Sequence, residues 1–126
     1  MKPLDRLLKT PRVEALPLES AVGFARDPSA EARVLFLPGD ASRPEVTDVA
    51  VVLGELLGLF PSLEIGVAVG EGVDEAAMRE RFGVTAFPTV IFSRHGETSK
   101  RLSRMQSWST YEDAARALLE ERGAPS

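Results

Sequence analysis

The stretch RFGVTAFPTVIF, residues 81–92, decides the fold of this chain. Residues 81–83 read as the end of a helix, because glycine commonly follows the last helical turn. Pro88 then stands directly before the run TVIF, whose β-branched and aromatic residues favour a strand. We therefore expect a helix end, a short turn with Pro88 at its close, and a strand that begins at Thr89.

Hydrophobic periodicity gives the elements on either side of this stretch. It predicts helices within residues 3–9 and over 18–25, 44–60 and 73–82, and strands over 13–16, 33–37, 63–69, 89–92 and 98–102. A last helix opens with a capping box, Ser109-Thr110-Tyr111-Glu112. The order β-α-β-α-β-α-β-β-α predicts an α/β fold with a mixed central sheet and helices on both faces. That is the thioredoxin-like arrangement.

Composition limits what such a fold can do. The chain has 126 residues, which suits one domain over 1–126, with a loose tail at 123–126. Its formal charge of −4 argues against a nucleic-acid partner, which needs a basic face. With no cysteine and a single histidine we expect no thiol catalysis, no metal and no redox cofactor. No apolar run is long enough for a signal peptide or a membrane span, so we expect a cytoplasmic protein without membrane insertion.

The expected working edge of this fold is the loop over residues 38–45, after the central strand. A thioredoxin-type cysteine pair belongs there, but residues such as Ala41, Ser42, Arg43 and Pro44 take its place. Pro88 supplies the second half of the edge. In thioredoxin-like proteins the matching proline follows a cis peptide bond, and such a bond before Pro88 would leave the backbone of Phe87 facing outward, where an extended peptide can pair with it. The alternative is that Pro88 simply enters a strand at its first residue.

Acidic residues gather near this edge. Glu45, Asp48 and Glu55 fall on one side of the helix over 44–60, and Asp40 lies in the loop before it. Such carboxylates can pair with guanidinium groups in bidentate fashion. They are also explained as a solvated face whose first-turn acids favour the helix dipole. Trp108 has two interpretations as well, as a cover of the core or as a platform beside Pro88.

Two segments together resemble the HyaE/HupG/HoxO family of hydrogenase accessory proteins. They are RPEVTDVAVVLGELLGLFP, residues 43–61, and RFGVTAFPTVIF, residues 81–92, with Trp108 near the last helix. The resemblance implies a thioredoxin-like protein that lacks the cysteine pair. It further implies a role in maturing the small subunit of uptake [NiFe] hydrogenases, by binding its precursor and twin-arginine signal peptide before export.

The absence of cysteine and this resemblance together imply a non-catalytic chaperone, with the small-subunit precursor and other hydrogenase accessory proteins as its expected partners. The predicted peptide-binding residues are Asp40, Glu45, Asp48, Glu55, Phe87, Pro88 and Trp108. One alternative is a scaffold that binds folded partners without recognising a signal peptide. Another is an enzyme that uses the fold without sulfur, although no suitable group of polar residues is evident near the predicted edge.

Overall fold

A computed structural model describes residues 2–121, and the predicted tail at 123–126 lies outside this part. The elements in chain order are α1 (Pro3–Leu8), β1 (Val13–Leu16), α2 (Leu18–Arg26), β2 (Arg33–Leu37), α3 (Pro44–Leu59), β3 (Glu64–Ala68), α4 (Glu75–Phe82), β4 (Thr89–Arg94), β5 (Glu97–Ser103) and α5 (Trp108–Glu121). Every predicted helix and strand is present. No helix among the described residues has the length and apolar character needed to cross a bilayer.

The strands form one five-stranded mixed sheet in the order β1-β3-β2-β4-β5. β3 pairs in parallel with both β1 and β2. β4 pairs antiparallel with β2, and β5 antiparallel with β4. The α/β architecture is therefore as predicted, with parallel strands joined by helices and a terminal antiparallel hairpin at one edge.

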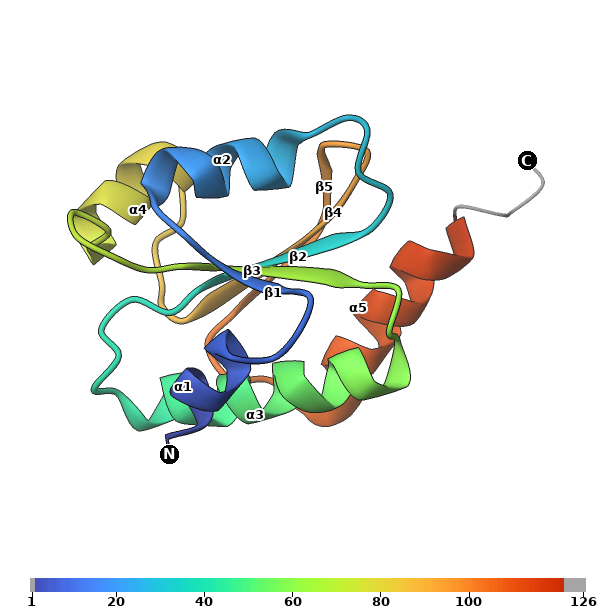
Figure 1. The fold of residues 1–126 in the computed structure, drawn as a ribbon, viewed down its shortest axis with the longest axis horizontal. Coiled ribbons are helices and arrows are strands. Elements are labelled where there is room, and N and C mark those ends of the chain that lie inside the picture. Colours follow the sequence, from blue (N-terminus) through green and yellow to red (C-terminus); the bar gives the residue numbers. More distant parts are fainter. Residues whose placement is uncertain (1, 122–126) are drawn as a thin grey trace.

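Helices cover both faces of the sheet (Figure 1). α1, α3 and α5 lie on one face, here the α3 side, and α2 and α4 on the other, the α2 side. β2 contributes side chains to the cores on both faces, because successive side chains of a strand point to opposite faces of the sheet. Val34 and Phe36 join the core of the α3 side, whereas Leu35 and Leu37 join that of the α2 side. All four are fully buried, as expected for a central strand.

The amphipathic stripe predicted for α3 is the largest helical contribution to the core. Six of its positions, Val46, Val49, Ala50, Leu53, Leu56 and Leu57, are buried, and Phe60 packs partly buried beside them. The helix ends at Leu59 before Pro61, which cannot continue it. Its length places its first turn at the loop over 38–43 and its last turn at the opposite end of the sheet.

Two helix starts differ from the predictions. α4 begins at Glu75 rather than at residue 73, because Asp74 is the N-cap and accepts the Ala77 N–H at 2.8 Å. α5 begins at Trp108, so Ser109 lies inside the helix and the predicted capping box is wrong. Ser107, just outside the helix, has its hydroxyl 2.9 Å from that of Thr110.

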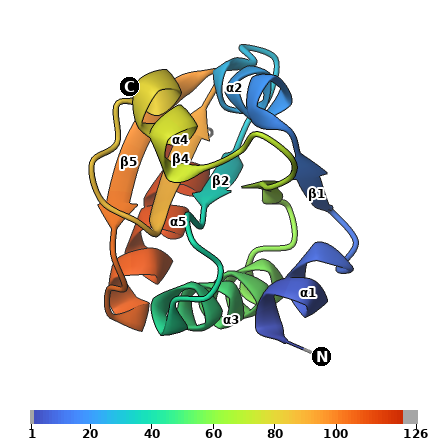
Figure 2. The ribbon, with the colours of Figure 1, turned by 90° about the vertical axis from the view of Figure 1, so that its left-hand side faces the viewer.

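The predicted working edge lies where β2 ends and β4 begins. Figure 2 looks onto this side of the molecule, with the loop between β2 and α3 and the segment that joins α4 to β4 in front of the sheet. Gly83 ends α4 in a left-handed conformation with φ 67°, and its N–H bonds the Arg79 carbonyl at 2.9 Å. The chain then runs along the edge to Pro88.

Candidate functional site

The Phe87–Pro88 peptide bond is cis, as predicted for this edge. Both residues are buried, and the Phe87 ring belongs to the core of the α2 side. The Phe87 side chain is therefore not an exposed platform. Within the described chain, however, its backbone N–H and C=O form no hydrogen bond, and the residue lines a hollow at the edge.

Gly39 lets the loop after β2 approach this segment closely. Its φ is 73°, a left-handed conformation that glycine adopts without strain. A Cβ at this position would lie 2.6 Å from Glu75 Oε2 and 2.8 Å from Phe87 Cβ. No other residue type fits between the loop, α4 and Phe87.

Glu75 ties the same loop to α4. Its carboxylate accepts the Asp40 N–H at 2.9 Å and pairs with Arg43, whose Nη1 lies 2.8 Å from Oε2. Arg79, one turn further along α4, adds a contact of 3.4 Å. The sequence predicts Glu75 only as a first-turn acid of a helix. Its partner Arg43 lies 32 residues away, and no local pattern indicates the pair.

The hollow beside Phe87 has a volume of about 330 Å³, and its charged lining residues are three arginines and one glutamate. Its residues are Arg43, Glu75, Arg79, Thr85, Ala86, Phe87 and Arg104. Three guanidinium groups thus face one carboxylate in a place where the sequence predicts acidic residues. Sequence reasoning missed Arg79 and Arg104, because each is one basic residue among many until the fold brings it to the edge.

Glu45, in the first turn of α3, meets Arg104 in a bidentate ion pair. Arg104 Nε lies 3.1 Å from Oε1 and 3.0 Å from Oε2, and its Nη2 also bonds Oε1. Met105 N–H donates to Oε2 at 3.1 Å. The hydrogen bond from Arg104, followed by that from Met105, lowers the pKa of Glu45 to about 2. Glu45 is therefore ionised and already occupied.

Asp40 shapes the loop. Its Oδ1 accepts both the Ser42 hydroxyl, at 2.7 Å, and the Ser42 N–H, at 2.9 Å, which closes an Asx turn. These two hydrogen bonds lower the pKa of Asp40. The side chain is exposed near Arg43, so its remaining oxygen faces solvent at the edge.

Asp48 and Glu55 differ from Glu45 in having no partner. Both are exposed, and within the described residues neither forms an ion pair or a side-chain hydrogen bond. Glu55 lies ten positions beyond Glu45, about 15 Å along the helix axis. There it lines a separate hollow with residues of α1 such as Arg6. The predicted acidic residues thus share one helix but occupy different surroundings.

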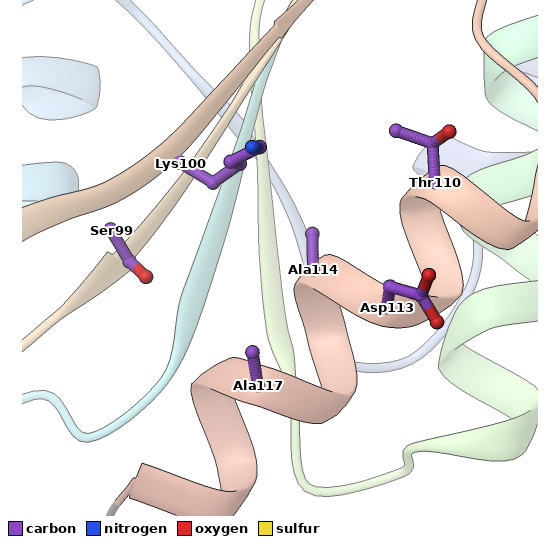
Figure 3. A pocket seen from close by; sticks show the side chains of 6 residues that line it. All are labelled: Ser99, Lys100, Thr110, Asp113, Ala114 and Ala117. Atoms are coloured by element: carbon purple, nitrogen blue, oxygen red, sulfur yellow. The ribbon is translucent and has the colours of Figure 1, made fainter.

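Trp108 is half-buried and packs against the core of the α3 side. This contact fits the interpretation of Trp108 as a cover of the core. A further hollow lies between β5 and α5 (Figure 3), with Ser99 and Lys100 on the strand and Thr110, Asp113, Ala114 and Ala117 on the helix. None of the predicted site residues lines it.

Two chemical observations limit the site. Among residues 2–121, no group of three or more His, Asp or Glu side chains could hold a metal ion. His95 sits in the β4–β5 turn, where its Nδ1 lies 3.2 Å from the Pro28 carbonyl oxygen, away from the edge. What the edge itself presents, in the described part of the chain, is unpaired backbone groups of Phe87, charged side chains and a hollow.

Comparison with known proteins gives the family. A family model described as hydrogenase-1 expression protein HyaE matches residues 6–111. The chain belongs to the HyaE family. Its curated relatives include the hydrogenase expression/formation protein HupG of Bradyrhizobium diazoefficiens, 41% identical over 86% of this chain and 72% of the relative. HoxO of Azotobacter vinelandii, with the same description, is 37% identical over 82% of this chain and 70% of the relative.

Solved structures show that this HyaE-family chain has a thioredoxin-like fold. Thioredoxin 2 from Pseudomonas aeruginosa matches with a TM-score of 0.61 and 24% identity, over 80% of this chain and 89% of the thioredoxin. Thioredoxin O2 from Arabidopsis thaliana matches with a TM-score of 0.66 and 15% identity, over 90% and 96% of the two chains. At such identities the likeness concerns the fold alone. The HyaE-family chain keeps this fold without any cysteine.

Proposed function

We propose that this protein is a non-catalytic chaperone that binds the small-subunit precursor of a [NiFe] hydrogenase through its twin-arginine signal peptide, before export from the cytoplasm. The chain's family supports the general role, that of an accessory protein in hydrogenase expression and formation. The precursor, the signal peptide and the cytoplasmic location are the specific parts of the proposal.

The observation that carries the proposal is the outer face of α3. Asp48, Val51, Glu55 and Leu59 follow one another at spacings of three and four residues, so they form one stripe on the helix surface. We call these residues the outer stripe. Val51 is 46% exposed and Leu59 56% exposed, which is unusual for apolar side chains of this size. The outer stripe thus alternates unpaired carboxylates with exposed apolar groups.

A twin-arginine signal peptide has the complementary chemistry. Its arginine pair is cationic, and the segment that follows is apolar. Asp48 and Glu55 can attract the guanidinium groups, and Val51 and Leu59 can cover apolar side chains that water would otherwise surround. The first turn of α3 starts at the edge that Phe87 lines, so one extended peptide can reach both surfaces.

The edge offers the second means of binding. The unbonded N–H and C=O of Phe87 can pair with the backbone of an extended segment, which gives affinity without regard to sequence. The carboxylates then supply the preference for arginine. Thiol–disulfide exchange requires a thiolate, which this chain cannot form, and the proposal therefore assigns binding rather than catalysis.

The test is calorimetric titration of the protein with the small-subunit signal peptide from the same genome, beside a peptide with both arginines changed to glutamine. We expect binding of the arginine peptide that weakens as salt rises, because screening reduces attraction between exposed charges. We expect several-fold weaker binding of the glutamine peptide, since each lost ion pair at an exposed site is worth up to about 1 kcal/mol.

A matched pair of variants tests the outer stripe. Asp48→Lys with Glu55→Lys should weaken binding and leave the thermal midpoint almost unchanged. Asp113→Lys with Glu80→Lys changes the net charge equally at exposed positions on other elements and should have a much smaller effect. Equal loss in both doubles would mean that only net charge matters. Binding to the mature subunit as tight as to the precursor would favour a scaffold that ignores the signal peptide.

A further inference from the structure

We infer that Glu45 is a dedicated guanidinium-binding subsite of this edge and that Arg104 is its built-in occupant, which an arginine of the partner displaces. This inference rests on the proposed function, and deepens it by naming the carboxylate that receives an arginine. It also assigns Arg104 the role of an internal competitor.

The ion pair itself shows which ligand Glu45 accepts. Arg104 presents two of its nitrogens to the two carboxylate oxygens, with Nε 3.1 Å from Oε1 and 3.0 Å from Oε2. This fork arrangement suits a planar guanidinium and not the single ammonium of lysine. Met105 N–H, 3.1 Å from Oε2, holds the carboxylate in the orientation that the fork requires. A guanidinium from another chain would find the same receptor.

The occupant is placed so that it can leave. Arg104 belongs to neither β5 nor α5, and its side chain is 59% exposed. Its φ of 64° lies in the left-handed region, which residues other than glycine seldom adopt. Exposed ion pairs contribute little net stability, because water competes for both charges. The Glu45 side chain is itself 29% exposed, so solvent reaches both partners and another guanidinium can exchange with that of Arg104.

Glu75, another carboxylate of the edge, does not have a guanidinium partner that can be exchanged in this way. Its side chain is only 19% exposed, and it holds Arg43, Arg79 and the Asp40 N–H at once. Removing any one partner leaves the others in place. Glu45 is the carboxylate whose guanidinium partner can be exchanged without releasing the loop after β2.

The backbone around Arg104 stays attached when its side chain leaves. Arg104 N–H donates to the Pro88 carbonyl at 2.7 Å, and that bond does not involve the guanidinium. Met105, beside it, is 37% exposed and forms an apolar surface next to Glu45. An arginine followed by an apolar residue thus finds a carboxylate and an apolar contact side by side.

A small probe tests the subsite without any signal peptide. In ¹⁵N-labelled Arg104→Ala, acetyl-arginine amide should shift the Met105 amide resonance, because that N–H bonds the same carboxylate. Acetyl-citrulline amide, its neutral counterpart, should not, and Glu45→Gln added to Arg104→Ala should abolish the response. No shift of Met105 in Arg104→Ala would overturn the inference, whatever the signal peptide does.

A second experiment measures displacement with the arginine-containing signal peptide. Arg104→Ala should bind it about fivefold more tightly than the unaltered protein, the value of one exposed competing ion pair. Arg104→Lys keeps the charge but loses the fork, and should also bind more tightly. Arg116→Ala, which removes an arginine paired with Glu112 on α5, controls for the change in net charge and should gain much less.

The outcomes separate the inference from the proposed function. If the unaltered protein binds the peptide and neither Arg104 variant binds more tightly, Arg104 is a structural clamp and the inference is wrong. If Met105 responds to acetyl-arginine amide but no form of the protein binds the signal peptide, the subsite stands and the proposed function fails. Thermal midpoints and circular dichroism of each variant identify any that do not fold.

Discussion

Glu45 and Glu75 carry the same charge at the same edge, but their surroundings differ. Glu75 joins a loop to a helix through several partners, whereas Glu45 faces one exposed guanidinium and one backbone N–H. The two carboxylates should therefore respond differently to replacement. We expect loss of Glu75 to disturb the path of residues 38–43, and loss of Glu45 to remove a charge together with the acceptor of the Met105 N–H.

The pH dependence of stability reports on Glu45. Its pKa falls from 4.5 to about 2 in the folded chain, first because of the hydrogen bond from Arg104. A carboxyl with a lowered folded pKa contributes stability that is complete above its unfolded pKa and is lost as the pH falls toward the folded value. We expect the thermal midpoint of the unaltered protein to exceed that of Glu45→Gln above pH 4.5, and the difference to shrink toward pH 2.

Thermal melts of both proteins across that range make the comparison. Asp27 and Asp40 also have lowered pKa values, but they titrate in both proteins and cancel in the difference. A difference that stays constant from neutral pH to the acid limit would show that Glu45 does not lose its charge there.

The sequence predicted the structural role of some single residues but not of others. The cis bond before Pro88 was predictable because the sequence around it and the order of the elements both indicate one type of edge. The pairing of Glu45 with Arg104 was not, since 59 residues separate them and only the fold brings the segment after β5 to the first turn of α3. Charge patterns on one helix therefore indicated an acidic edge, whereas the fold adds guanidinium groups from elsewhere.

At the scale of elements, the start of α4 depends on Asp74, the residue just before the helix. Asp74 accepts the Ala77 N–H, one of the amide groups that a helix start leaves without an internal partner. Asp74→Ala should lower the free energy of unfolding by about 1 kcal/mol, measured by urea denaturation. Asp74→Ser keeps an oxygen in reach of the amide and should cost much less. Equal losses in the two variants would mean that the cap is not what Asp74 contributes.

Element positions were predictable wherever the apolar period was long. The stripe of α3 repeats over four turns, and its bounds differ from the prediction by one residue. The start of α5 was harder to place, because Ser107 and Ser109 both precede acceptable first turns and the sequence alone does not rank them. Asp74 shows the same difficulty, since an acid just before a helix and one just inside it look alike in a sequence.

At the scale of the molecule, two cores share one sheet. Leu53 is fully buried on the α3 side and Met78 on the α2 side, with β2 between the two layers. Leu53→Ala and Met78→Ala should each lower the free energy of unfolding by about 2–5 kcal/mol. Because each layer needs the same strands, both variants should keep one cooperative transition by circular dichroism and by Trp108 fluorescence. Transitions that separate by probe in either variant would contradict this.

The parallel pairing of β1, β2 and β3 followed from the helices between them, and the antiparallel hairpin of β4 and β5 followed from its short turn. The antiparallel pairing of β4 with β2 did not follow in this way, because a helix, α4, also precedes β4. The candidate site followed only in part. The fold predicted where the edge lies, but its charge depends on contacts between segments that are distant in the sequence.

Gly39 also determines which positions of the loop after β2 can accept a new side chain. A side chain at residue 39 has no room against Glu75 and Phe87, whereas Ala41, two residues later, is exposed. Ala41→Cys would introduce the sole thiol of the chain, so a fluorescent label could be attached there without any other change. Such a label would stand at the edge itself and report in real time when a partner arrives and when it departs.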